Sequence, residues 1–352
     1  MLFIGYFTLF VLVPVMFFLA HIWSASAASP KYFTCMMTKV RLLSPVFSCN
    51  LIEWLQYHLS MGIDHIYVAN DCSWPDAQVA DYLHHLTDVT GQVSLINVVP
   101  HMCQKQSKTT NMTFNNYARH DCEWVGNIDM DEFLVFRTDN ASSYDFKTFL
   151  RELPHVAYRF PWWMMSTHGQ EQRPPGLVIE NYFSGWFEPA HIKMFAKSQF
   201  VKEWWFQLHP HFYEELENIT IHGKPLTKKF QNSRADQDDY ATVTINVGTG
   251  REQAIRVITA PLYIQHYRYY SYEEYILQKG KLNITAGGVN NPWHVGPRKK
   301  WEGGNITGTV IQQKFVETMA ELVRKSLYQA RVDNPAIAFG KCFEYWDLPH
   351  NR

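Results

Sequence analysis

The sequence predicts an α/β fold in which helices flank a mixed, mostly parallel β-sheet. Short apolar runs typical of buried strands alternate with amphipathic helical segments along the first 130 or so residues. Polar residues follow several of these runs directly, and in such sheets ligands bind beyond the carboxyl ends of the strands. With 352 residues, 46% of them hydrophobic, the chain can bury a large core. We expect one large domain at residues 28–352, behind an N-terminal segment at residues 1–27.

The first strand and helix units are bounded by residues that begin or end helices. Asn50-x-x-Glu53 resembles a capping box at the start of a helix, and Gly62 is expected to end that helix. Asp76 can cap the next helix, which Gly91 is expected to end. The strands between them are predicted at residues 32–40, 63–69 and 93–99.

The same alternation continues further along the chain. A mostly polar segment at residues 104–120 is predicted to be helical and to precede a fourth strand that reaches Asp129. A helix follows Ser143, and its apolar residues are Phe146, Phe149, Leu150 and Leu153. Later elements are predicted as strands at residues 157–165 and 262–267 and as helices at residues 271–277 and 309–331.

An acidic motif, Asp129-x-Asp131-Glu132, interrupts an apolar run near the middle of the chain. Carboxylates are costly to bury unpaired, and their oxygens are ligands for magnesium, manganese or calcium. The alternative for the motif is a solvated turn with a chance acidic pair, and the alternative for Glu132 alone is that it anchors the turn after the motif. Thr38-Lys39 and Asn70-Asp71 also follow predicted strands, so we expect the three polar strand ends to meet at one edge of the sheet.

The N-terminus predicts membrane targeting. Residues 2–23 carry no Asp, Glu, Lys or Arg and are long enough to cross a bilayer of about 30 Å. We expect a retained signal anchor, while the small residues at 24–28 favour the alternative of a cleaved signal peptide. The expected location is the Golgi or ER membrane, single-pass with a lumenal domain, or outside the cell if the segment is cleaved.

Sequons and cysteines agree with a lumenal location. Asn-x-Ser/Thr sequons occur at Asn111, Asn140, Asn218, Asn283 and Asn305. The six cysteines are an even number that fits disulfides, and their pairing stays open. The formal net charge of −1 provides no field that would attract nucleic acid, so we expect no nucleic-acid partner.

Several motifs in a fixed order resemble those of glycosyltransferase family 92 and of the family-2-like glycosyltransferases. The resemblance extends over about residues 32–280. Its segments are Thr38-Lys39, Asn50-Leu51-Ile52-Glu53-Trp54-Leu55-Gln56-Tyr57-His58, Gly62-Ile63-Asp64-His65-Ile66-Tyr67, Asn127-Ile128-Asp129-Met130-Asp131-Glu132-Phe133, Arg173-Pro174-Pro175-Gly176, the region of Lys193, and His266-Tyr267-x-x-x-Ser271-x-Glu273-Glu274-Tyr275. One departure is the longer lead from Lys39 to Asn50.

The resemblance implies a GT-A, Rossmann-like fold and a hexosyltransferase activity. Such an enzyme moves a sugar, often galactose, from a nucleotide-sugar donor to a glycan hydroxyl with inversion at the anomeric carbon. The implied donor is a UDP-sugar, with Mn²⁺ as the first choice of cation and Mg²⁺ as the second. The implied metal ligands are Asp129, Asp131 and His266. The implied donor-binding residues are Thr38, Lys39, Asn70, Asp71, Asp129 and Lys193.

Inversion requires a carboxylate that accepts the proton of the acceptor hydroxyl. Glu171, on the loop after the strand at 157–165, is our first choice, and Glu188, beside aromatic residues, is the second. Lys193 has the alternative role of a solvated strand residue, and His266 that of a satisfied core residue. For the whole chain, the alternative function is a non-catalytic carbohydrate-binding protein that retains the fold, and a metal-dependent phosphohydrolase ranks third.

Overall fold

The computed structural model describes most of the chain from residue 29 onward. The described residues are 29–41, 45–73, 77–103, 105–137, 145–153, 156–201, 220–221, 224–225, 240–246, 252–258, 260–277, 302, 309–310, 313–334, 339 and 341–346. The chain divides into two units, Met1–Lys31 and Tyr32–Arg352, and the fold below is that of the second. The predicted membrane segment at residues 2–23 lies outside the described residues. None of the helices that the structure describes is long and apolar enough to span a bilayer.

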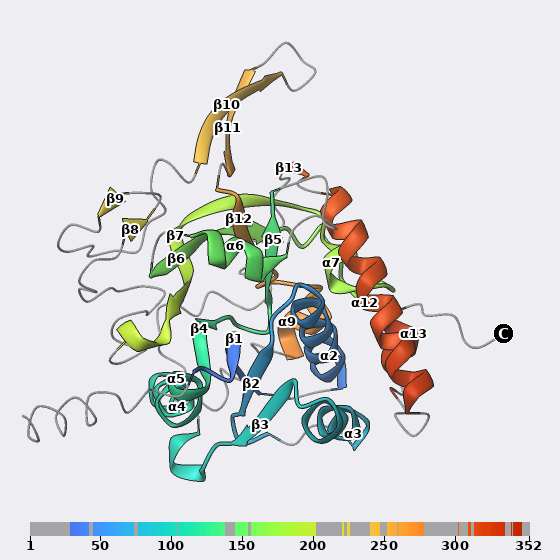
Figure 1. The fold of residues 1–352 in the computed structure, drawn as a ribbon. Helices are drawn as coiled ribbons and strands as arrows, with labels where there is room; N and C mark the ends of the chain where they lie inside the picture. Colours follow the sequence, from blue (N-terminus) through green and yellow to red (C-terminus); the bar gives the residue numbers. More distant parts are fainter. Residues whose placement is uncertain are drawn as a thin grey trace, which may run out of the picture. The chain divides into compact units, whose positions relative to one another are not determined.

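A nine-stranded mixed sheet forms the centre of this unit (Figure 1). Its main path runs in the order β3-β2-β1-β4-β7-β6-β12-β5, and β13 pairs with β7. β7 and β5 run antiparallel to their neighbours on this path, whereas the other six strands of the path run parallel to one another, which confirms the mostly parallel sheet. The strands are β1 (Tyr32–Val40), β2 (His65–Asn70), β3 (Val93–Asn97), β4 (Cys122–Asn127), β5 (Glu132–Phe136), β6 (Ala157–Met165), β7 (Ser184–Lys197), β12 (Leu262–His266) and β13 (Thr309–Val310).

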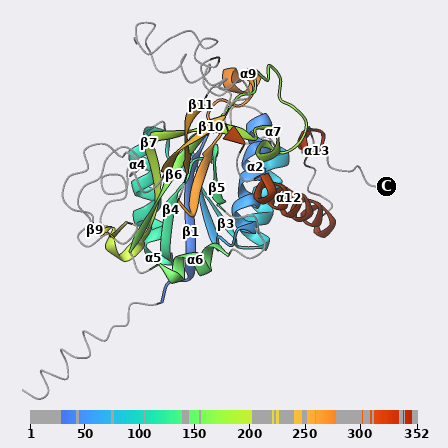
Figure 2. The same ribbon diagram turned by 90° about the horizontal axis from the view of Figure 1, so that it is seen from above.

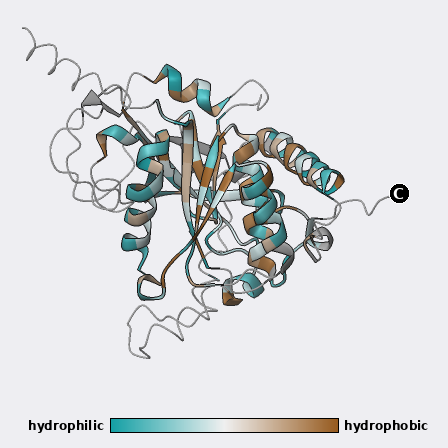
Figure 3. Cartoon of the chain, turned by 60° about the horizontal axis from the view of Figure 1, so that its bottom comes forward, coloured by the Kyte–Doolittle hydropathy of each residue, from teal (hydrophilic) through white to brown (hydrophobic). Residues whose placement is uncertain are grey.

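Helices lie on both sides of the sheet, as Figure 2 shows for α4 and α5 on one side and α2 and α12 on the other. Figure 3 shows mixed hydrophilic and hydrophobic colouring along these helices, as expected of elements with one buried side. In α12, for example, Phe315, Met319, Val323 and Leu327 are buried. The helices are α2 (Pro45–Ser60), α3 (Ala77–His84), α4 (Gln106–Thr113), α5 (Arg119–Asp121), α6 (Phe146–Glu152), α7 (Val178–Asn181), α9 (Tyr272–Tyr275), α12 (Gln313–Asp333) and α13 (Lys341–Trp346).

Short elements complete the described part of the unit. The π-helical turns η1 (His85–Val89) and η3 (Phe114–Ala118) extend α3 and α4. The 3₁₀ turns are η2 (Pro100–Met102) and η5 (Ser198–Phe200). Two separate hairpins pair β8 (Thr220–Ile221) with β9 (Lys224–Pro225) and β10 (Tyr240–Asn246) with β11 (Glu252–Ile258).

The predicted start of α2 at Asn50 is wrong. The helix begins at Pro45, and proline suits the first helical turn because no intrahelical N–H bond is needed there. Asn50 lies inside the helix and donates from its side-chain amide to Glu274 at 3.2 Å. Glu53 is fully buried and accepts backbone N–H groups of Val178 and Ile179, so it stabilises the start of α7 instead.

Other boundaries differ less. The last long helix begins at Gln313 rather than near Thr309, because Thr309 and Val310 pair with β7 as a short strand. Asp145 caps α6 by accepting the N–H of Lys147. The proposed cap at Asp76 lies outside the described residues. Gly62 and Gly91 both have positive φ angles, of 97° and 66°, as expected where a helix ends in a left-handed residue.

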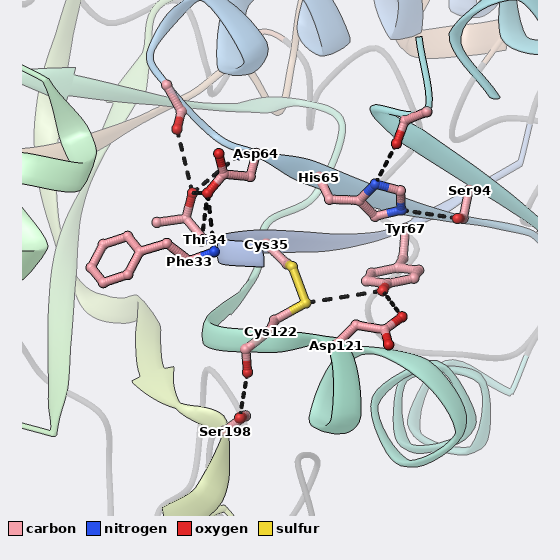
Figure 4. Close-up of a disulfide and its surroundings, with 12 residues drawn as sticks. Phe33, Thr34, Cys35, Asp64, His65, Tyr67, Ser94, Asp121, Cys122 and Ser198 are labelled. Atoms are coloured by element: carbon pink, nitrogen blue, oxygen red, sulfur yellow. Dashed lines mark hydrogen bonds between the residues drawn. A yellow bond between two sulfur atoms is a disulfide. The ribbon is translucent and has the colours of Figure 1, made fainter. Parts of the chain in front are cut away.

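All six cysteines form disulfides, which fits the expected oxidising compartment. Cys35–Cys122 joins β1 to β4, Cys49–Cys342 joins α2 to α13, and Cys72–Cys103 joins the segments that follow β2 and β3. Around the first of these, Ser198 donates to the carbonyl of Cys122, and Tyr67 donates to Asp121 at 2.7 Å (Figure 4).

The sequons are largely beyond what the structure describes. Asn140, Asn218, Asn283 and Asn305 lie outside the described residues. Asn111 lies in α4 and is half-buried, and its sequon partner Thr113 is only 1% exposed.

Candidate active site

The acidic motif forms the turn between β4 and β5. The N–H of Glu132 donates to the carbonyl of Asp129 at 3.0 Å, and the N–H of Asp129 donates back to the Glu132 carboxylate at 2.8 Å. Glu132 is fully buried. This reciprocal pair of bonds closes the turn, which confirms the interpretation of Glu132 as its anchor.

Lys193 on β7 pairs with two of the motif's carboxylates. Its Nζ lies 2.7 Å from Asp129 Oδ2 and 3.1 Å from Glu132 Oε2, and the residue is 4% exposed. Burial alone would lower the pKa of Lys193, but the two carboxylates outweigh it and raise the pKa above its ordinary value. The alternative of a solvated strand residue is therefore wrong, and Lys193 supplies a fixed positive charge inside the turn.

His266, the last residue of β12, faces Asp131 of the acidic turn. Pairing of β12 with β5 places His266 opposite Glu132, and His266 Nε2 lies 3.6 Å from Asp131 Oδ2. Burial lowers the pKa of His266, and Asp131 opposes that shift. Its Nδ1 atom is buried without a hydrogen-bond partner among the described residues. A neutral imidazole and a neighbouring carboxylate are side chains that can act together as ligands of a transition-metal cation.

The ring of Trp162 on β6 lies close to both His266 and Lys193. Its ring lies 4.3 Å from the His266 ring and 5.9 Å from Lys193 Nζ, measured to ring centroids. Its apolar strand favours a role in core or lid packing, and the ring lies near both the imidazole and the ammonium group. All three side chains are buried, so the aromatic ring packs against both polar groups away from bulk water.

The polar ends of β1 and β2 lie at the same edge of the sheet as the acidic turn. Ile128 donates its N–H to the carbonyl of Met37, which continues the parallel pairing of β4 with β1 to the residue before Thr38. Thr38 Oγ1 is buried without a hydrogen-bond partner among the described residues. The expected common edge is confirmed.

An ion pair and hydrogen bonds of a side-chain amide fix the polar side chains at the ends of β1 and β2. Lys39 Nζ lies 3.1 Å from the buried carboxylate of Asp71. Asn70 donates from its amide to Asn97 at 3.2 Å and accepts from Ser73, so β2 and β3 end in one bonded unit. These side chains form a preorganised polar rim.

The two candidate bases occupy different surroundings. Glu188 on β7 lies directly opposite Trp162 in the antiparallel pairing with β6, and side chains of such a pair lie on the same face. Glu171 is exposed on the loop after β6, and its carbonyl accepts the N–H of Glu273 in the first turn of α9. The strand pairing therefore places Glu188 beside the aromatic ring that contacts His266.

A buried network supports the loop after β6, and we did not predict it. Arg173 donates to Glu274 at 2.6 Å and also to Asn50 on α2, while Tyr182 donates to the other oxygen of Glu274 at 3.2 Å. Ser271 and Glu274 form the capping box of α9. The signal was present in the motifs that contain Arg173 and Glu274, but sequence alone does not pair residues about 100 positions apart.

The predicted metal ligands do not form one cluster. Asp131 faces His266, whereas Asp129 faces Lys193. Within the described part of the chain, no set of three or more His, Cys, Asp and Glu side chains is arranged to hold a metal ion. Of the three predicted ligands, Asp131 and His266 are the two that the structure places face to face.

Comparison with known proteins gives one family match. The model of glycosyltransferase family 92 matches residues 43–327. No curated protein matches the chain.

Among solved structures, residues 1–349 of S. aureus TarS are 12% identical to this chain over 48% of each chain, with a TM-score of 0.30. The same part of TarS in complex with UDP-GlcNAc gives 12% identity over 48% of this chain and 46% of that chain, with a TM-score of 0.30. Galactosyltransferase LgtC with donor and acceptor sugar analogues gives 12% identity over 47% of this chain and 58% of that chain, with a TM-score of 0.25. The matched part spans about half the length of these proteins. On the family match, which covers most of its length, the chain belongs to glycosyltransferase family 92.

Proposed function

We propose that this protein is a metal-dependent, inverting glycosyltransferase with a GT-A fold. It transfers a sugar, with galactose as our first choice, from a UDP-sugar to a glycan hydroxyl. Membership of family 92 supports the reaction class. The observation that carries the site is the meeting of Asp131 and His266 at the carboxyl edge of the sheet, beside the Lys193 ammonium group.

The residues at this edge fit a divalent cation. Asp131 supplies a carboxylate, and His266 supplies a buried imidazole whose Nε2 lies 3.6 Å from that carboxylate. A carboxylate with an imidazole suits Mn²⁺, and Mg²⁺ is also commonly held by few protein ligands together with substrate phosphates. When bound, such an ion stabilises the negative charge that develops on the leaving diphosphate.

The protein's own charges are arranged for an anionic donor. Lys193 neutralises carboxylate charge in the turn and so reduces repulsion of the diphosphate. At the rim, Lys39 and Asp71 hold each other, and Asn70 is fixed by its bonds to Asn97 and Ser73. We assign the ribose and uracil to this rim, within reach of the buried hydroxyl of Thr38.

Glu188 is our proposed general base. Its place opposite Trp162 supports this choice over Glu171. In the transfer, Glu188 accepts the proton of the acceptor hydroxyl while that oxygen bonds to the anomeric carbon and the bond from this carbon to the diphosphate breaks. Trp162 excludes water next to this group, which limits hydrolysis of the donor.

We also propose that the domain at residues 28–352 faces the lumen of the Golgi or ER. The disulfides support an oxidising compartment. Residues 2–23 would then hold the protein in the membrane. Protease protection of microsomes tests this: lumenal residues resist protease until detergent is added, whereas digestion of intact microsomes would contradict the orientation.

The central experiment is a donor panel. Full-length protein purified in detergent is incubated with radiolabelled nucleotide sugars, with Mn²⁺ or with EDTA, and with a panel of glycan acceptors. We expect transfer from one UDP-sugar that EDTA abolishes. Asp131→Asn should reduce transfer at least about 100-fold, as loss of a group that stabilises transition-state charge commonly does, while Asp88→Asn, at an exposed residue of η1, serves as the matched control.

The outcome separates the candidate functions. Glycan binding without transfer or hydrolysis of any donor would reject the enzyme and support a carbohydrate-binding protein. Transfer that is unaffected by EDTA and by Asp131→Asn would reject the role of the cation and of Asp131.

A further inference from the structure

Arg268 lies two residues beyond His266 and on the same side of the chain. The N–H of Tyr267 donates to the carbonyl of Asp131 at 2.7 Å, so the extended pairing continues one residue past the end of β12. The Tyr267 hydroxyl donates to the side chain of Gln265 at 2.6 Å, so these two alternate residues point to one side. His266 and Arg268 therefore point to the other side, where His266 faces Asp131.

The charge of Arg268 acts on the His266 imidazole. Burial is the main cause of the lowered pKa of His266, and Arg268 lowers this pKa further, whereas Asp131 opposes the shift. The guanidinium carbon of Arg268 also lies 5.8 Å from the centroid of the Tyr269 ring. This ring contact keeps the guanidinium group close to the pair formed by Asp131 and His266.

Arg268 has no counter-charge, in contrast to Lys193 and Lys39 at the same edge of the sheet. Lys193 is bound by two carboxylates of the acidic turn, and Lys39 pairs with Asp71. Arg268 is half-buried, and within the described part of the chain its guanidinium group forms no ion pair and donates no hydrogen bond. A partly desolvated guanidinium group without a partner favours an anionic ligand, and its planar fork of N–H donors matches the oxygens of a phosphate.

The same charge opposes the binding of a metal ion alone. Because carboxylates already neutralise Lys193, Arg268 is the uncompensated positive charge next to the two proposed metal ligands, Asp131 and His266. It repels a divalent cation that enters by itself and attracts a diphosphate. Once a diphosphate is bound, its negative charge exceeds the charge of the guanidinium group, and a cation is attracted instead.

We propose that Arg268 binds the diphosphate of the donor and makes the nucleotide bind before the metal ion. The role in transfer rests on the proposed function. Arg268 then stabilises the charge of the leaving diphosphate from the protein side. The nucleotide raises the affinity for the metal ion, and by linkage the metal ion raises the affinity for the nucleotide.

The test measures the binding of each ligand without the other. Full-length protein in detergent is titrated with UDP in the presence of EDTA by calorimetry, and separately with Mn²⁺ without nucleotide, with free Mn²⁺ followed by electron paramagnetic resonance. Arg268→Gln should weaken UDP affinity about tenfold or more, the effect of losing hydrogen bonds from a charged group. The same variant should strengthen Mn²⁺ affinity about threefold or more, because it removes a positive charge beside the cation site. A variant that merely folds poorly would lose both affinities.

Two further variants make the result specific. Arg268→Lys keeps the positive charge but not the planar fork, so Mn²⁺ affinity should stay at the wild-type value while UDP affinity falls by less than in Arg268→Gln. Arg151→Gln on α6 is the matched control, because it removes an equal charge from a guanidinium group that packs on the Phe33 ring near the start of β1. The start of β1 is the opposite edge of the sheet from Thr38, and this variant should change neither affinity.

The results separate this proposal from the proposed function. An unchanged affinity of Arg268→Gln for either ligand, a loss of both affinities together, or no binding of UDP by wild type would each overturn it. If no donor is turned over but the two affinities of Arg268→Gln shift in opposite directions, the binding role of Arg268 stands and the enzyme function falls. If a donor is transferred and Arg268→Gln leaves both affinities unchanged, the role of Arg268 falls alone.

Discussion

Glu53 on α2 should make the stability of this protein fall as pH rises. The residue is fully buried, and burial raises its pKa from 4.5 to about 7, although bonds from the N–H groups of Val178 and Ile179 and the nearby Arg173 oppose the shift. The folded state thus holds the proton more tightly than the unfolded state. This stabilising contribution is complete below pH 4.5 and is lost as pH rises through about 7.

The magnitude follows from the shift. A difference of 7 − 4.5 = 2.5 pKa units, at about 1.4 kcal/mol for each unit, gives about 3 kcal/mol. Glu53→Gln removes the titration but keeps one oxygen for a backbone N–H. The NH₂ group of the new glutamine faces one of the two backbone N–H groups and cannot accept its hydrogen bond. This lowers the free energy of unfolding by about 1–3 kcal/mol, by the same amount at every pH.

The assay is urea unfolding of wild-type protein and Glu53→Gln, with disulfides intact, at half-unit steps from pH 4 to pH 8. Between these limits the variant should gain about 3 kcal/mol relative to wild type. Contributions of all other groups cancel in this difference. Glu321→Gln, on the exposed side of α12, is the control. A difference between wild type and Glu53→Gln that stays constant across the range would refute the reasoning.

Three further predictions concern other buried or site residues. Burial lowers the pKa of His58 from 6.5 to about 3, so the stabilising contribution of the neutral imidazole is present above pH 6.5 and is lost on acidification. Between pH 7 and pH 4 the free energy of unfolding of wild type should fall by about 3 kcal/mol more than that of His58→Gln. Parallel curves of unfolding free energy against pH for the two proteins would contradict this. Lys193→Met leaves two carboxylates without their cation and should cost about 3–5 kcal/mol in thermal unfolding; a loss under about 1 kcal/mol would show that the pair is not needed. Glu188→Gln should lower kcat about 100-fold or more with little change in donor KM; if Glu171→Gln shows this loss instead, the choice of base is wrong.

The elements with strong local signals were predictable. β1 and β6 have the predicted bounds, because each is an apolar run that ends at polar residues. The position of the acidic turn and its closeness to Thr38 also follow from the alternation of strands and helices, since parallel strands place their carboxyl ends together.

Features that depend on distant partners were not predictable. Asn50 has the sequence context of a helix cap, yet its amide is bound by Glu274, 224 residues away. Lys193 lies 64 residues from Asp129, and nothing local distinguishes it from an exposed strand lysine. The pairing of Cys35 with Cys122 likewise follows from the adjacency of β1 and β4 in the sheet and not from the spacing of the two cysteines.

The Cys49–Cys342 disulfide has a consequence for how the protein is made. The two cysteines that it joins are 293 residues apart in the sequence. At a synthesis rate of about 5–20 residues per second, Cys49 waits roughly 15–60 seconds for its partner. During that time the four other cysteines, which form bonds of shorter span, are already present and compete for it. Native pairing thus requires either early closure of those two bonds or later exchange, and maturation of the protein depends on the thiol chemistry of its compartment.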